Sequence, residues 1–283
     1  MNERLSGAAL IAVSAASFGV MPILARSAYA DGTGIDTLLF LRFAAGAVFM
    51  LAFARMRGLR FPGGKSLAGM ALMGALGYVG QSLCYFTALK YASAGLVALL
   101  LYVYPALVTL LSALLFRERI TRAKALALIL ALAGTTLIVG IGGRGDYRGV
   151  ILGLAAALIY SVYIVAGSRI IKPGQSIQAS AIIMSAAALV FGGLTAAGGF
   201  QPPHSARGFA SVAAIALVCT IVALSTFFAG MERVGPTKAS MISTLEPVVT
   251  VTAAAIFLGE PLTALNLFGG GLILGSLFVL LRS

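Results

Sequence analysis

Charged residues are scarce in this sequence. Of its 283 residues, 20 are Lys or Arg and 8 are Asp or Glu, so only 10% are charged. A soluble domain usually carries roughly 25% charged residues. Because so few charges cannot cover the surface of a water-soluble globule of this length, we expect the chain to lie in a membrane.

Residues that commonly carry catalysis or bind metals are scarce too. A single histidine excludes an HExxH motif and any site with several histidine ligands. Cys84 and Cys219 both lie within apolar runs, which is typical of small core residues and not of a disulfide. We therefore expect no catalytic residue, no metal and no cofactor.

Nucleotide-binding and hydrolase motifs are incomplete, out of context or absent. Residues 140–145 match GxGxxG, but they follow a long apolar helix and no strand, so we expect no dinucleotide site. Gly63-Gly64-Lys65-Ser66 resembles the end of a P-loop, yet position 59 is Leu, which argues against ATP. No GxSxG occurs and no Asp lies deep in an apolar run. We expect a protein that is not an enzyme.

Apolar residues dominate instead, at 60% of the chain. A membrane-spanning helix needs ~20 of them in a row. The first run, Gly7 to Ala25, exceeds the ~7–15 residues of a signal-peptide core, so we expect it to be retained as a helix. Windows of ~19 residues predict ten helices, near 6–26, 34–54, 67–89, 93–116, 122–140, 149–168, 177–198, 209–230, 237–258 and 263–281.

The basic residues are distributed unevenly between the two sides of the predicted bundle. Fourteen lie on the side that holds both termini, five on the other, and Arg42 lies within a helix. The positive-inside rule then places both termini in the cytoplasm, and we expect a multi-pass protein of the bacterial inner membrane. The net charge of +12 thus reflects topology and contact with anionic lipid, with no nucleic-acid partner.

The two halves of the chain repeat at an offset of 142 residues. This offset places Gly7 on Gly149, Pro105 on Pro247 and Glu118 on Glu260. Each half, 1–141 and 142–283, holds five predicted helices. Because five is odd, the second half enters the membrane from the opposite side. The prediction is an all-α membrane protein with ten helices in two inverted five-helix repeats, an arrangement that permits alternating access.

Short motifs in their order resemble a known family. They are Ala88-Leu89-Lys90-Tyr91-Ala92-Ser93-Ala94, Tyr104-Pro105, Arg117-Glu118-Arg119 and Leu245-Glu246-Pro247-Val248. With the repeat, they resemble the EamA-type exporters of the drug/metabolite transporter (DMT) superfamily, among which are the YddG-like amino-acid exporters. The resemblance implies a carrier of small metabolites. It also implies a central cavity lined by helices 1, 3, 4, 6, 8 and 9, with helices 5 and 10 peripheral.

Helical periodicity gives an independent prediction of the cavity wall. Polar and aromatic side chains share single faces of the predicted helices, counted at 100° per residue, while Tyr104 points away from its face. The expected cavity-lining, substrate-binding residues are Ser17, Phe18, Met21, Tyr78, Gln81, Ser82, Tyr85, Tyr102, Pro105, Tyr160, Tyr163, Ser240, Ser243, Thr244, Glu246 and Pro247. The alternative for the small polar residues is helix packing.

Two prolines mark corresponding mid-helix positions. Pro105 and Pro247 each remove a backbone hydrogen bond and kink a helix, near the depth where a midplane binding site is expected. The carbonyls four residues earlier, at Leu101 and Ser243, would then be free to accept hydrogen bonds from substrate. Kinks that serve packing alone are the alternative.

Two charges are expected within the membrane, Arg42 and Glu246. Burying either costs roughly 2.5–3.5 kcal/mol near the helix centre, so we expect each to have a structural or functional role. At 1.5 Å per residue, their predicted depths differ by only ~4 Å. Glu246 therefore has three candidate roles: pairing with Arg42, contact with a substrate ammonium group, or proton coupling.

Three further features concern helix ends and packing. Glu118 and Glu260 oppose the macrodipole at helix C-termini, and we expect both to anchor a gate or loop, with Arg117 and Arg119 beside the first. Gly271 and Gly275 form a GxxxG face, which we expect to pack within a monomer, with a dimer as the alternative.

The expected function is therefore secondary transport. The substrates are small metabolites, foremost amino acids with aromatic or other apolar side chains, which would stack on the tyrosines. Export of cationic drugs or other metabolites is the alternative, since tyrosine faces also attract cations. A membrane enzyme acting on lipid-linked substrates and a channel are the remaining classes.

Overall fold

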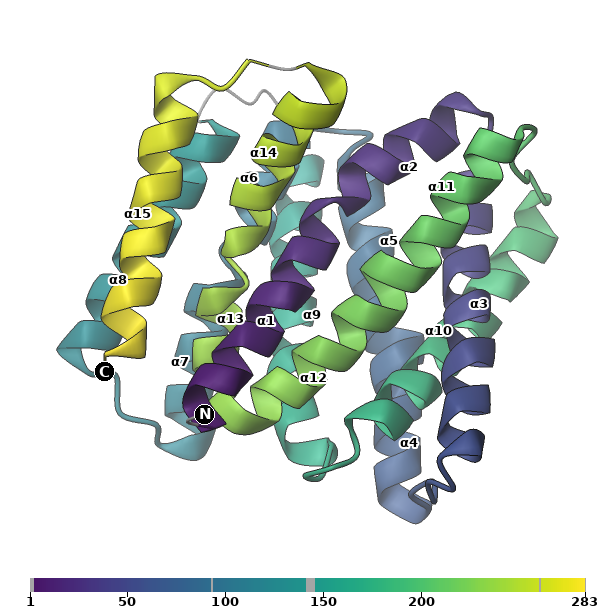
Figure 1. Ribbon diagram of the computed structural model, residues 1–283, viewed down its shortest axis with the longest axis horizontal. Coiled ribbons are helices and arrows are strands. Elements are labelled where there is room, and N and C mark those ends of the chain that lie inside the picture. The colour runs from purple at the N-terminus through teal and green to yellow at the C-terminus, as the bar shows by residue number, and fades with distance from the viewer. Residues whose placement is uncertain (1–2, 93, 141–145, 260, 283) are drawn as a thin grey trace.

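The computed structural model describes residues 3–92, 94–140, 146–259 and 261–282. Within these ranges the only regular structure is helical, and ten helical segments are long and apolar enough to cross a membrane. They stand side by side in one bundle (Figure 1). The predicted number of helices is confirmed, and large apolar side chains such as Leu114, Leu189 and Ile256 are exposed on the outside.

We number these segments as spans 1 to 10. Spans 1 to 5 are α1 (Glu3–Gly19) with α2 (Met21–Ala30); α3 (Ile35–Met56); α4 (Gly64–Leu72), η1 (Met73–Tyr78) and α5 (Val79–Ala88); α6 (Ala94–Leu101) with α7 (Tyr104–Phe116); and α8 (Arg122–Val139). Spans 6 to 10 are α9 (Tyr147–Ile170); α10 (Ser176–Gly198); α11 (Ala206–Ala216), η2 (Leu217–Val222) and α12 (Ala223–Val234); α13 (Pro236–Ile242) with α14 (Leu245–Leu258); and α15 (Ala264–Leu281).

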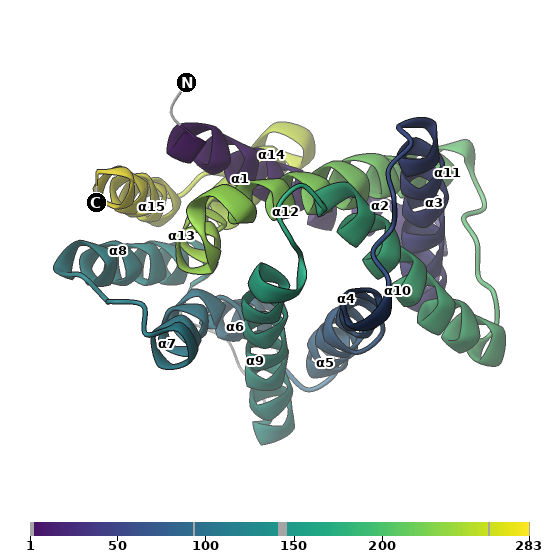
Figure 2. The ribbon, with the colours of Figure 1, turned by 90° about the horizontal axis from the view of Figure 1, so that it is seen from below.

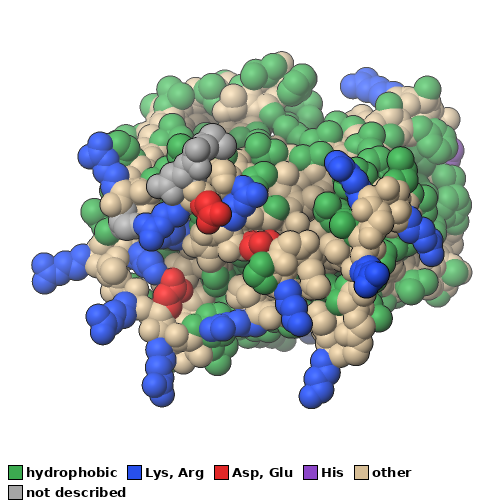
Figure 3. Space-filling model, turned by 60° about the horizontal axis from the view of Figure 1, so that its bottom comes forward, with side chains coloured by type: hydrophobic (Ala, Val, Ile, Leu, Met, Phe, Trp, Pro, Cys, Tyr) green, Lys and Arg blue, Asp and Glu red, His purple; other side chains and the backbone are tan. Residues whose placement is uncertain are grey.

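Both ends of the chain lie on the same side of the bundle, which we call the terminal face. Span 1 begins there and span 10 ends there (Figure 1). Lys and Arg side chains ring this face (Figure 3). We call the other side the opposite face.

Prolines explain the breaks in spans 1, 4 and 9. Pro22, Pro105 and Pro247 each stand in the first turn of a second helical piece, α2, α7 and α14. A proline is tolerated there because a first-turn N–H has no partner within the helix, whereas it interrupts the hydrogen bonds of a continuous helix. The breaks in spans 4 and 9 fall at corresponding places in the two halves.

Spans 3 and 8 instead contain a wider turn. The π-helical segments η1 and η2 are related by 144 residues, close to the repeat offset. Such segments insert a residue into an α-helix and often lie at functional sites. Here η2 carries Thr220, whose hydroxyl donates to the carbonyl of Ile215, five residues earlier, at 3.0 Å.

Helix pairing follows the repeat. Spans 2 and 7 pair through α3 and α10, spans 5 and 10 through α8 and α15, and spans 4 and 9 through α7 and α13. Span 1 packs on span 8 as span 6 packs on span 3. Figure 2 shows the α8–α15 pair at one margin of the bundle and the α3–α10 pair at the other. The fold is thus two five-helix repeats of inverted orientation.

The α8–α15 pair depends on glycines other than the predicted ones. A Cβ on Gly134 would lie 2.5 Å from the Gly269 carbonyl oxygen, and one on Gly269 would lie 2.6 Å from that of Gly134. At Gly271 and Gly275 a Cβ would meet nothing within 4 Å among the described residues. The expectation that these two glycines pack within the chain is therefore wrong. The helix α15 approaches α8 through Gly269 and not through Gly271 or Gly275.

Candidate functional site

A cavity of about 820 Å³ extends from the opposite face into the middle of the bundle. Its outer wall includes Arg26, Leu89 and Val139 near helix ends, and its inner wall reaches Tyr104 and Glu246 at the broken spans. The volume lies within the ~300–1,000 Å³ of small-molecule pockets. The predicted cavity residues that line it are Phe18, Met21, Tyr78, Gln81, Ser82, Tyr85, Tyr102, Tyr160, Glu246 and Pro247. Arg42, which was predicted only as a charge within the membrane, lines it as well.

Spans 2 and 5 also contribute to this wall, beyond those implied by the family resemblance. Leu38, Leu39 and Arg42 come from span 2, and Ile138 and Val139 come from the end of span 5. Span 2 matters most, because it brings a buried cation, Arg42, into the wall.

Six predicted residues lie outside the cavity wall: Ser17, Pro105, Tyr163, Ser240, Ser243 and Thr244. All six are buried. The Ser243 and Thr244 hydroxyls donate to carbonyls of their own helix, at 3.0 and 2.7 Å. A single helical wheel fails here because the break at Ser243–Thr244 turns α14 relative to α13.

Tyr104 was missed for the same reason, because a single helical wheel was applied across a helix break. The break after Tyr102 changes the direction of span 4, so Tyr104 lines the cavity instead of pointing away. Its hydroxyl donates to the Ser240 carbonyl at 3.4 Å, and its ring centre lies 4.8 Å from that of Tyr160. Pro105 was the available signal, since a proline marks the start of a new helical piece.

Two carbonyls were expected to be free at the prolines, those of Leu101 and Ser243. The Ser243 carbonyl accepts the Glu246 N–H at 3.0 Å, so it is occupied within the chain. Leu101 belongs to the cavity wall.

Arg42 is held in the wall by three neutral acceptors. Its Nε donates to Thr220 Oγ1 at 3.0 Å, its Nη1 to Met21 Sδ at 3.0 Å and its Nη2 to Tyr78 Oη at 3.1 Å. The guanidinium carbon lies 4.7 Å from the centre of the Phe43 ring. No hydrogen bond or ion pair joins it to Glu246 in the described part of the chain. The pairing that we considered from the sequence is absent from this conformation.

Glu246 occupies the first turn of α14. A carboxylate is favourable there because the helix dipole presents positive charge at its N-terminus. The Tyr102 hydroxyl interacts with this carboxyl group. The helix break that Pro247 follows thus helps to explain how a carboxylate is accommodated at mid-span.

An aromatic layer closes the inner end of the cavity. Tyr160 and Tyr163 stack with ring centres 6.1 Å apart, and Tyr163 meets Tyr78 edge-on at 5.8 Å. Tyr163 also lies 6.1 Å from Phe228, which lines a second pocket beyond the layer. Tyr163 therefore stands between the cavity and the terminal face.

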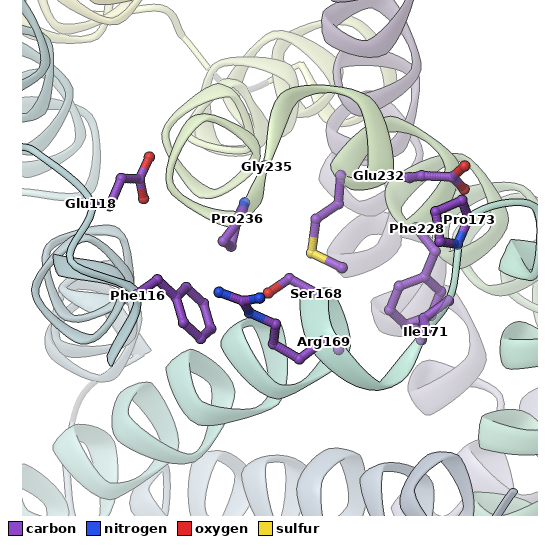
Figure 4. Close-up of a pocket in the computed structure, with 12 residues that line it drawn as sticks. Phe116, Glu118, Ser168, Arg169, Ile171, Pro173, Phe228, Glu232, Gly235 and Pro236 are labelled. Atoms are coloured by element: carbon purple, nitrogen blue, oxygen red, sulfur yellow. The ribbon is translucent and has the colours of Figure 1, made fainter. Parts of the chain in front are cut away.

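The second pocket, of about 350 Å³, lies at the terminal face (Figure 4). Arg169 covers the Phe116 ring at 3.9 Å, and Glu232 accepts the Gly174 N–H at 3.0 Å. Figure 4 shows Glu118 and Glu232 on two sides of this pocket, with Ser168 and Arg169 between them.

Glu118 joins the two halves beside this pocket. Thr237 Oγ1 donates to Glu118 Oε2 at 2.7 Å, and Lys124 Nζ lies 2.6 Å from Oε1. Burial alone would raise the pKa of Glu118, but the hydrogen bonds from Lys124 and Thr237 and the nearby lysine charges lower it below its usual value. Lys124 and Thr237, and not Arg117 or Arg119, are therefore the partners. Glu260 lies outside the described residues.

At the opposite face, Asp31 ties span 1 to the loop before span 8. Its Oδ2 accepts the N–H groups of His204 and Ser205, each at 2.8 Å. Hydrogen bonds from Ser205 and then His204 lower the pKa of this exposed carboxyl group. The first helix of one repeat and the third of the other are thus fastened together at this face.

The cavity wall combines aromatic, cationic and acidic side chains. Among the described residues, no group of three His, Cys, Asp or Glu side chains could hold a metal ion. Among the described residues, the wall offers tyrosines, the guanidinium groups of Arg26 and Arg42, and the carboxyl group of Glu246, a set that can recognise a small polar molecule with an apolar part.

Sequence comparison decides the family. The profile of the EamA-like transporter family matches residues 5–140 and again residues 147–282. This chain belongs to the EamA-like transporter family. As a member of that family, it is a multi-pass membrane protein related to transporters.

Individual relatives of this EamA-family protein are also described as transporters. An uncharacterized transporter, YcbK of Bacillus subtilis, is 25% identical over 96% of this chain and 91% of its own length. The uncharacterized inner membrane transporter YedA of Escherichia coli is 29% identical over 82% and 77%. A probable terminal-alkyne amino-acid exporter of Streptantibioticus cattleyicolor is 25% identical over 89% and 86%.

A solved crystal structure shares this EamA-family fold. It superimposes with a TM-score of 0.84 over 97% of this chain and 96% of its own, at 25% sequence identity.

Proposed function

We propose that this protein is a secondary transporter that exports small metabolites, foremost amino acids with aromatic or other apolar side chains, by alternating access. The observation that carries the proposal is the tyrosine-walled cavity, which extends from one face to an aromatic layer at mid-span. A carrier needs such a site closed toward one side.

The closed side is the terminal face. There the Thr237–Glu118 hydrogen bond joins span 9 to the end of span 4, and Arg169 covers Phe116. With the basic side chains at this face in the cytoplasm, the conformation is open outward. We place both termini in the cytoplasm of a bacterial inner membrane, with residues 1–141 and 142–283 as the two repeats; the boundary between them lies outside the described residues.

The residues of the wall and one relative support this substrate class. Tyr85, Tyr102 and Tyr160 supply ring faces and edges for apolar or aromatic side chains. The Streptantibioticus relative is described as a probable amino-acid exporter. Cationic drugs are the second candidate, because the same wall holds Glu246.

The test is a substrate panel in sealed proteoliposomes, with and without a pH gradient. Internal amino acid should accelerate uptake of labelled amino acid, since counterflow requires a carrier. If cationic drugs compete for uptake and no amino acid does, the export of cationic drugs is the supported function. Flux without counterflow would indicate a channel, and a modified lipid detected by mass spectrometry would indicate an enzyme.

A further inference from the structure

Arg42 has spare hydrogen-bonding capacity inside the cavity. Its side chain belongs to the cavity wall, and the residue is only 4% exposed. A guanidinium has five N–H donors, and three of them serve Thr220, Met21 and Tyr78. All three acceptors are neutral, and a thioether is a weak one.

A buried cation that lacks a counter-charge is costly. Desolvation of the charge is offset only when an anion or a full set of hydrogen bonds compensates it. In the described part of the chain no carboxylate forms an ion pair with Arg42. A negatively charged group of a bound molecule would supply the missing charge.

The guanidinium is also held in place before any ligand arrives. The η2 turn presents Thr220, whose hydroxyl proton is committed to the Ile215 carbonyl, so its oxygen is free to accept from Arg42 Nε. Phe43 lies beneath the guanidinium and packs edge-on against Tyr78, with ring centres 4.9 Å apart. Because the guanidinium group is already held in place, less conformational entropy is lost when a ligand binds to it.

We propose that Arg42 binds the carboxylate of the transported amino acid. The inference rests on the proposed function and narrows its substrate class to molecules that carry a carboxylate. Glu246, in the same cavity, disfavours simple anions, so a zwitterion matches the wall better than a cation or an anion alone. Planar, bidentate recognition of carboxylates is the particular strength of arginine.

The composition of the chain supplies a direct assay. The sequence contains nine tyrosines and no tryptophan, and tyrosines line the cavity. An indole ligand in the cavity would therefore accept excitation energy from tyrosine, and the protein itself would contribute no tryptophan emission. L-tryptophan, tryptamine and indole-3-propionate carry the same indole but differ in the carboxylate and the ammonium group.

We expect wild-type protein to bind L-tryptophan about 10- to 100-fold more tightly than tryptamine, as for hydrogen bonds to a charged group. Arg42→Gln should lose that factor for L-tryptophan and leave tryptamine unchanged or tighter. Arg42→Lys should retain part of the preference for L-tryptophan. Thr220→Val should reduce this preference, because it removes one of the acceptors that hold the guanidinium group. Arg207→Gln, which removes an exposed cation at the opposite face from outside the cavity wall, is the matched control and should change the ratio little.

The comparison between ligands separates binding from folding. If Arg42→Gln weakens L-tryptophan and tryptamine equally, Arg42 is a structural residue and the inference fails while the proposed function stands. If the wild type binds L-tryptophan no better than tryptamine, the inference fails as well. If L-tryptophan does not bind the wild type at all, the proposed substrate class falls, and the inference falls with it.

Discussion

The Thr237–Glu118 hydrogen bond should set how often the terminal face opens. Thr237→Val removes the hydroxyl at nearly constant volume and leaves the Lys124–Glu118 pair intact. A hydrogen bond to a charged acceptor is worth about 1.5–3 kcal/mol when buried. Because the Glu118 side chain is 35% exposed, solvent screening reduces this to about 1 kcal/mol, or about a five-fold shift in the population of the open state.

Thiol labelling can measure that shift. Met231 lines the pocket at the terminal face, and its side chain is buried in this conformation, at 3% exposure. With Cys84 and Cys219 replaced by Ala, a Met231→Cys reporter should react with a hydrophilic maleimide only when this face opens. The labelling rate should rise about five-fold in Thr237→Val, in proportion to the open population.

Thr252→Val is the matched control. Thr252 lies on the same span, exposed on the outside, and its hydroxyl donates only to the Val248 carbonyl of its own helix. An unchanged labelling rate in Thr237→Val, or an equal rise in Thr252→Val, would refute the role of the Thr237–Glu118 bond as a latch.

The pH dependence of this bond has a definite sign. Because the pKa of Glu118 is lowered in the folded protein, its stabilisation is fully present above the usual glutamate value of about 4.3 and is lost as the pH falls through the lowered pKa. The difference in thermal stability between wild type and Thr237→Val should therefore be constant from pH 7 to about pH 5. It should shrink below the glutamate range. A difference that vanishes already near neutral pH would contradict the lowered pKa.

Three further predictions concern other parts of the structure. Glu246→Gln should weaken tryptamine about 10-fold in the same fluorescence titration, because it removes the negative charge of the cavity; an unchanged pH profile of transport would exclude proton coupling through this residue. The Tyr163 hydroxyl is buried with no partner among the described residues, so Tyr163→Phe should raise the apparent melting temperature by about 2–4 °C; a fall would reveal a partner. Gly134→Ala should lower that temperature, since its Cβ would meet the Gly269 carbonyl at a cost of about 1–3 kcal/mol, whereas Gly271→Ala should not; a shift to a smaller particle in Gly271→Ala would instead show a dimer.

The architecture could be predicted from the sequence because it depends on long apolar runs and on a repeat. Ten spans and their inverted halves follow from hydropathy and from the match of Pro105 with Pro247. These signals extend over twenty or more residues each, so an error of a few residues at a helix end does not alter them.

The details of the cavity were harder to predict because they depend on helix direction at single residues. The sequence showed that Pro105 and Pro247 interrupt helices, but not how far each second piece turns. A turn of that kind brought Tyr104 into the wall and removed Ser240, Ser243 and Thr244 from it. The π-helical turn at Thr220, which holds Arg42, has no short sequence signature, so the partners of that arginine could come only from the structure.

The partners of Glu118 at the terminal face are not repeated in the sequence of the other half. Under the offset of 142, Glu118 corresponds to Glu260, but Thr237 corresponds to Gly95 and Lys124 to Asn266, so neither the hydroxyl nor the ammonium group is repeated. In the carrier that we propose, exchanging the roles of the two halves would therefore not form equivalents of the Thr237–Glu118 and Lys124–Glu118 contacts at the outer side. In the carrier that we propose, with both termini in the cytoplasm, the unloaded form would rest facing outward. Its half-saturating substrate concentrations on the two sides of the membrane would differ accordingly, although the equilibrium distribution of the substrate would not.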